Sequence, residues 1–160
     1  MNLTDGLSIV IEYMSISSEE VKALEYEKLN GKQRIEVRKN WRACPVSKWN
    51  ATTVRSYLQC LTQHRFKMDY ISDNIRQENA IISQFIKQYG REVLKEFIRD
   101  CVKDYKPTKQ YPIVTFGFMY TYQRKHILPA IIKKRQAQEE RLKELEAQKE
   151  MEFTDYTEVF

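Results

Sequence analysis

The chain has 160 residues, 42% of them hydrophobic, and a formal net charge of +5, which fits one domain with short appendages. Its four glycines and four prolines are too few for a β-rich fold with many turns. No apolar run approaches the roughly 20 residues that cross a bilayer, so we expect no membrane insertion. Three cysteines without a CxxC pair favour a reduced, cytoplasmic protein with buried thiols.

The residue types that serve enzymes and metal sites form no recognisable motif in this chain. Neither a phosphate-binding loop of the form GxxxxGKS/T nor a GxSxG elbow is present. The only histidines, His64 and His126, belong to no HExxH or HxxxH pattern. We therefore predict that the protein is not an enzyme and binds neither a metal nor a cofactor.

The start of the chain should contain one well-defined helix. Apolar residues alternate over 2–14, which fits either a strand or a short helix. Ser17 and Glu20 have the spacing of a capping box and predict a helix over 18–30. Asn30 and the following glycine should end that helix.

A basic connector is predicted over 32–48, interrupted by Pro45. It carries Trp41, and Trp49 follows directly; each tryptophan has a cation beside it. Two interpretations remain open, since these indoles either stack on nucleic-acid bases or anchor the connector to the core.

Helical periodicity predicts an all-α bundle of about five helices, followed by an extended C-terminal helix and a short tail. The helices after the connector are expected over 50–65, 73–89, 91–105, 112–127 and 130–150. Asn50 caps the first of these, which buries Val54, Tyr57, Leu58 and Leu61. Gly90 is a link so short that the two helices around it should form an antiparallel hairpin, with Phe97 in the middle of the apolar face.

Charge divides the chain into blocks. Residues 31–70 carry nine bases against two acids, and residues 106–135 carry seven bases and no acid. Residues 136–160 carry eight acids against three bases. Basic blocks of this kind suit phosphate binding, whereas acidic ends suit protein partners.

Residues 75–126 resemble the C-terminal domain of DnaD-like replication proteins of Gram-positive bacteria and their phages. The similar features are the helix VLKEFIRDCV, a basic break, and a helix in which Gly117 and Phe118-Met119 match the family's Gly and Ile-Leu. Tyr122 stands where the family has Trp, and no winged-helix domain is evident ahead of it. The chain also resembles small proteins of tailed phages.

The resemblance implies single-stranded DNA binding or contact with a helicase loader. Under this interpretation four cations neutralise phosphates and one of two tyrosines stacks on a base. The nucleic-acid-binding candidates are Lys106, Lys109, Tyr120, Tyr122, Arg124 and Lys125.

Beyond the aromatic helix, Pro129 should kink or break the chain. Residues 130–151 have too few apolar positions for a buried face and no sustained heptad, so they predict an exposed helical arm. The last ten residues mix acids with aromatics, as do the tails of bacterial single-strand-binding proteins and the clamp-binding tails of phage late-transcription coactivators. The partner-binding candidates are Phe153, Tyr156 and Phe160; the alternative is a disordered, solvated end.

The expected organisation is an N-terminal helix and connector at 1–48, a helical core at 49–129, and an arm with a tail at 130–160. Three hypotheses follow. The first is a phage-type replication accessory protein that binds DNA and recruits a replisome partner. The second is a protein-only adaptor acting on a host or phage transcription machine. The third is a small virion or packaging component such as a small terminase, with the arm forming a homo-oligomer.

Overall fold

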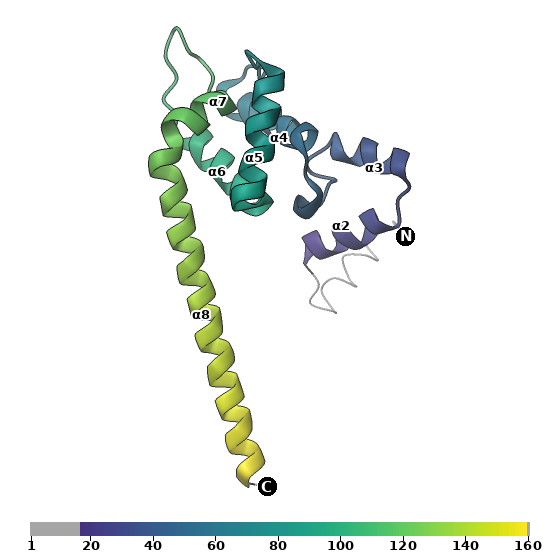
Figure 1. The fold of residues 1–160 in the computed structure, drawn as a ribbon, viewed down its shortest axis with the longest axis vertical. Helices are drawn as coiled ribbons and strands as arrows, with labels where there is room; N and C mark the ends of the chain where they lie inside the picture. Colours follow the sequence, from purple (N-terminus) through teal and green to yellow (C-terminus); the bar gives the residue numbers. More distant parts are fainter. Residues whose placement is uncertain (1–16, 160) are drawn as a thin grey trace.

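The computed structural model describes residues 17–159, which are arranged as helices joined by short loops (Figure 1). The elements are α2 Ser18–Glu27, α3 Gly31–Arg38, η1 Val46–Lys48, α4 Ala51–Phe66, α5 Ile75–Tyr89, α6 Arg91–Asp104, α7 Phe116–Phe118, η2 Met119–Gln123 and α8 Arg124–Val159. No strand occurs in this range, so the predicted all-α fold is confirmed. The strand-or-helix expectation for 2–14 lies outside the described residues.

Capping residues set the beginnings of the early helices. Ser17 Oγ accepts from the Glu20 amide at 3.2 Å, and the Glu20 carboxylate accepts from the Ser17 amide at 2.9 Å, which confirms the predicted capping box. Asn30 was expected to end the first helix. It instead caps the next one, because its side chain accepts a hydrogen bond from the Gln33 amide at 2.9 Å at the start of α3. The first part of the predicted connector is therefore helical.

The two tryptophans anchor the connector to the core. Trp49 is fully buried, and its indole nitrogen donates to the Cys44 carbonyl at 3.1 Å. Trp41 packs on Tyr57 with ring centroids 4.9 Å apart and on Trp49 at 6.4 Å. Of the two interpretations of these indoles, the structure supports packing.

The core forms where α4, α5 and α6 meet. Gly90 joins α5 to α6 with a φ of 91°, a left-handed value that favours glycine. Phe85 and Phe97, which are nearly equidistant from this link, stack at 4.9 Å. Phe116 closes the cluster at 6.3 Å from the Phe97 ring. The predicted hairpin is confirmed, and the helix after it packs on the same aromatic centre.

The predicted helix over 112–127 is wrong in its first part. Residues 105–115 form an irregular loop, and Thr115 caps the one-turn helix α7 by accepting from the Phe118 amide at 3.3 Å. The π-helical turn η2 then leads directly into α8. π-Helical turns often occur at functional sites because the extra residue redirects side chains.

The break expected at Pro129 does not occur, because α8 runs through the proline. Ile127, Leu128 and Ile131 are all buried around this position. Their packing supplies several apolar contacts, whereas the proline removes a single helix hydrogen bond. Tertiary packing therefore keeps the helix continuous.

Helix α8 extends far beyond the rest of the body (Figure 1), and its last partly buried residue is Arg135. Arg135 makes ion pairs with Glu92 at 3.5 Å and Glu96 at 2.8 Å on α6. Every described side chain from 136 to 158 is exposed, and we call residues 136–159 the free arm. It is roughly 36 Å long. The helix expected to end near 150 continues to Val159, so the described part of the tail is helical as well.

The three cysteines differ in accessibility, which leads to a prediction for thiol labelling. Cys44 and Cys101 are buried, and burial raises the pKa of both thiols. Cys60 is half-buried, with an Arg42 guanidinium nitrogen 3.6 Å from its sulfur. We expect one thiol to react quickly with a disulfide reagent in the native protein and the other two only after unfolding. Three rapidly reacting thiols without denaturant would contradict this packing.

Candidate nucleic-acid interface

A basic groove lies where the C-terminal ends of α4 and α6 come together. Its volume is about 350 Å³, and its lining consists of Leu61, His64, Arg65, Arg99, Val102 and Lys103. Three permanent cations and a histidine therefore share one depression, with no carboxylate among its described lining residues. Cations near helix C-termini are favourable because they face the negative end of the helix dipole.

Contacts within the body hold the arginines of the basic groove. Arg65 donates from Nη1 to the Val102 carbonyl, and its guanidinium lies 4.7 Å from the centre of the Phe66 ring. Arg99 Nε is 3.2 Å from Asp100 Oδ1. These bonds use only part of each guanidinium, which has five N–H donors in total. The remaining donors suit an oxyanion such as a phosphate.

A chain of aromatic contacts leads from the basic groove to the π-helical turn. Phe66 meets Tyr105 edge-on at 6.0 Å, and Tyr105 meets Phe118 at 5.4 Å. Phe118 in turn lies 4.9 Å from Tyr122. Phe118 and Tyr122 are exposed at the end of this chain, with 39% and 65% of their surfaces accessible.

The exposed aromatics line a second depression, which we call the aromatic pocket. It has a volume of about 380 Å³ and lies between the first turns of α5, the loop 105–115 and the π-helical turn. One wall is largely apolar and includes Tyr105, Tyr111, Ile113, Phe118 and Tyr122. The other wall is polar and includes Asp73, Asn74, Gln77 and Glu78.

Hydrogen bonds tie the polar wall of the aromatic pocket to the core. The Tyr70 hydroxyl donates to Glu78 at 2.7 Å and accepts from the Phe116 amide at 3.0 Å. Burial raises the pKa of Tyr70, and the nearby Glu78 carboxylate adds to this shift, so the phenol stays protonated. Burial also raises the pKa of Tyr105, whose hydroxyl donates to the Tyr111 carbonyl at 2.7 Å. These bonds position α5, the loop and α7 around the pocket.

The structure brings some of the six predicted nucleic-acid residues together. Lys106 and Lys109 lie in the exposed loop that carries Tyr111, and Tyr122 lines the aromatic pocket. Lys125 is exposed one turn after Tyr122.

Tyr120 and Arg124 face a different side of the chain. The Arg124 guanidinium lies 4.0 Å from the Tyr120 ring centre, and Arg124 borders a separate depression with Tyr89 and Leu128. Two residues that are two apart on a helix point roughly 200° away from each other. Tyr120 and Tyr122 therefore cannot belong to one stacking surface.

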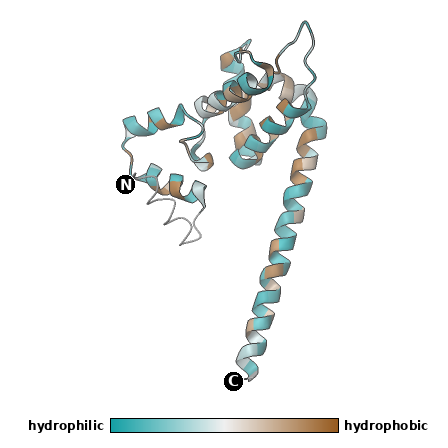
Figure 2. Ribbon diagram, turned by 180° about the vertical axis from the view of Figure 1, so that it is seen from behind, coloured by the Kyte–Doolittle hydropathy of each residue, from teal (hydrophilic) through white to brown (hydrophobic). Residues whose placement is uncertain are grey.

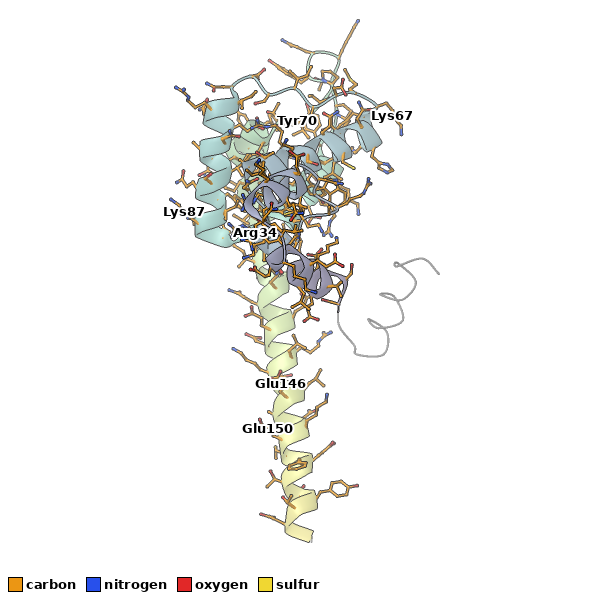
Figure 3. All side chains as sticks on the ribbon, turned by 90° about the vertical axis from the view of Figure 1, so that its right-hand side faces the viewer. Arg34, Lys67, Tyr70, Lys87, Glu146 and Glu150 are labelled. Atoms are coloured by element: carbon orange, nitrogen blue, oxygen red, sulfur yellow. The ribbon has the colours of Figure 1, made fainter. Side chains whose placement is uncertain are left out.

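None of the cationic residues of the basic groove was among the nucleic-acid-binding candidates predicted from the sequence. His64, Arg65, Arg99 and Lys103 come from two helices that are far apart in the chain. Arg65 belongs to the block of nine bases over 31–70 that the sequence analysis identified. Arg99 and Lys103 belong to α6, in which acids alternate with bases, so the charge distribution along the sequence did not single them out. Lys67 is the C-cap residue of α4, and Figure 3 shows it on the opposite side of the body from Lys87.

The partner-binding candidates lie on the free arm. Phe153 and Tyr156 are 72% and 71% exposed, whereas Phe160 lies outside the described residues. Ile131, Leu142 and Phe153 are spaced eleven residues apart, a spacing that returns to the same helix face after three turns. The face that buries Ile131 against the body therefore continues along the free arm as an exposed apolar stripe, completed by Leu145 and Tyr156. Figure 2 shows apolar segments along the otherwise hydrophilic arm.

Among residues 17–159, no group of three or more metal-ligating side chains comes together. In the same part of the chain, none of the helices has the length and apolar character that a membrane span requires. Comparisons of the chain with protein-family models, curated proteins and solved structures gave no match.

Proposed function

We propose that the protein is a phage-type replication accessory protein that binds single-stranded DNA. The observation that carries this proposal is the basic groove, which gathers cations from two helices without a carboxylate among its described lining residues. The resemblance of residues 75–126 to DnaD-like proteins supports the same class of function.

In this proposal the DNA backbone follows the basic groove and reaches the loop that carries Lys106 and Lys109. Bases beyond the groove stack on Tyr111 and Tyr122, both of which are exposed. Aromatic faces bind unpaired bases, whereas a duplex keeps its bases stacked, so single strands are favoured.

We expect the protein to bind a labelled single-stranded oligonucleotide with micromolar affinity at low salt, and this affinity should fall steeply as salt rises. The double substitution Arg99→Ala and Lys103→Ala should weaken binding about tenfold. It should also reduce the slope of log K against log salt by about one to two units, because two phosphate contacts are lost. Fluorescence anisotropy across a salt series measures both quantities.

A matched control removes two charges elsewhere. Lys32 and Lys87 are exposed on α3 and α5, and changing both to Ala should leave the salt slope nearly unchanged. Equal losses in the two double variants would show that binding follows net charge and not the groove. No binding by the wild type at low salt would remove the main support for a replication role.

The free arm favours a second role, the recruitment of a protein partner. Its exposed apolar stripe is surrounded by eight acids and three bases over 136–160, so the complementary surface is apolar with basic residues around it. The acids near the helix C-terminus also oppose the helix dipole, and a cationic partner would offset this repulsion. We propose a replication or transcription protein with such a surface. A homo-oligomer, as in a packaging component, would instead be seen as a multimer by light scattering.

A further inference from the structure

A buried carboxylate, Glu78, lines the aromatic pocket with no Lys, Arg or His of the described residues within ion-pair distance. Glu78 is only 5% exposed, and its two oxygens accept from the Tyr70 hydroxyl at 2.7 Å and the Ser72 hydroxyl at 2.5 Å. None of the ion pairs within the described part of the chain includes Glu78. Burying a charge in this way is costly unless hydrogen-bond donors surround it.

The carboxylate of Glu78 has capacity for another donor. An ionised carboxylate offers about four lone-pair sites, and the two hydroxyls occupy two of them. Since Glu78 is part of the pocket lining, a ligand in the pocket is the natural source of a further donor. Asp73 adds a second, exposed carboxylate on the same wall.

The opposite wall of the aromatic pocket fits a flat ring. Phe118 and Tyr122 lie 4.9 Å apart with their planes inclined by 45°, and Tyr111 borders the same space. A ligand that suits both walls is therefore planar and carries N–H donors on one edge. A nucleobase with an amino group has this form, because exocyclic amines donate to carboxylates. Arg65 of the basic groove is connected to the pocket through Phe66, which lies 6.0 Å from the pocket residue Tyr105, and on this path the groove cations would hold the phosphates of neighbouring nucleotides.

We propose, on the basis of the DNA binding proposed above, that the aromatic pocket takes one unstacked base and prefers cytosine or adenine to thymine. Cytosine and adenine present an amino group to the carboxylate wall. Thymine presents the carbonyl oxygen O4 at the corresponding position, and that oxygen repels a carboxylate.

The test measures the affinities of three labelled homopolymers of about 15 nucleotides, dC, dA and dT, by fluorescence anisotropy at one salt concentration. The dC and dA strands should bind at least about fivefold more tightly than dT. Glu78→Gln keeps the size of the side chain and removes its charge, so it should bring the dC-to-dT ratio close to one. Arg99→Ala with Lys103→Ala serves as the control, because it should weaken binding of all three strands and preserve the ratio.

The outcomes separate the two proposals. Equal binding of dC, dA and dT by the wild type overturns the base preference while leaving DNA binding intact. A folded Glu78→Gln variant with an unchanged ratio also overturns it. If thermal melting shows that this variant is unfolded, Asp73→Asn at the exposed rim must lower the ratio, and an unchanged ratio there is equally decisive. No binding of any strand overturns both proposals.

Binding of N-acetyl-arginine amide that depends on Glu78, together with equal binding of the strands, would assign the pocket to a cationic side chain.

Discussion

Replacing Phe97 with Ala should lower the free energy of unfolding by about 3–5 kcal/mol. Phe97 is fully buried in α6, where it stacks on Phe85 at 4.9 Å and meets Phe116 edge-on at 6.3 Å. The substitution leaves a cavity among three helices, and it removes aromatic contacts in addition to buried area. Denaturant titration followed by circular dichroism measures the loss.

Phe153→Ala is the matched control, because the same side chain is removed from an exposed position. Phe153 is 72% exposed on the free arm, so its loss should change the free energy of unfolding by less than about 0.5 kcal/mol. A loss of under about 1 kcal/mol for Phe97→Ala would show that the aromatic centre does not hold α5, α6 and α7 together.

Deleting residues 152–160 should abolish binding of the partner protein while leaving folding almost unchanged. The described side chains of this segment are exposed, and the hydrogen bonds of Thr154 and Thr157 run to carbonyls within the helix itself. We therefore expect the melting temperature to change by no more than about 2 °C. A pull-down from the cell in which the protein is naturally made, with and without these residues, identifies the protein that is lost.

Substitutions on opposite faces of the free arm test whether the apolar stripe itself binds the partner. Phe153→Ala with Tyr156→Ala removes the exposed stripe in a full-length chain and should lose the same partner as the deletion. Met151 is 70% exposed but lies on the opposite helix face from Leu142, so Met151→Ala should keep the partner. A large fall in melting temperature on deletion would mean that the segment belongs to the folded body, and recruitment by the arm would have to be abandoned.

Local chemistry explains how much of the fold could be predicted. The capping box at Ser17 and the N-cap at Asn50 are interactions between residues three apart, so the sequence shows them directly. The apolar faces of α5 and α6 follow from helical spacing, and the short link at Gly90 brings them together. The exposure of the free arm was also predictable, because few apolar residues follow Ile132.

The candidate interface was predicted only in part. The acid-free block over 106–135 pointed to Tyr122, which lines the aromatic pocket, and to Lys106 and Lys109, which lie in the same loop as the pocket residue Tyr111. It also grouped Tyr120 with Tyr122, although helical geometry separates residues two apart.

Tertiary structure alone decided three features. The basic groove exists because α4 and α6 end side by side, which unites Arg65 with Arg99 across 34 positions of the chain. Helix α8 passes through Pro129 because buried neighbours outweigh one missing hydrogen bond. Glu78 lies buried where the hydroxyls of Tyr70 and Ser72 each donate to one of its oxygens. By itself the sequence determined where most helices begin and which faces they bury, since those properties depend on residues a few positions apart. The groove and the pocket needed the folded chain, because their side chains converge only when helices distant in sequence pack together.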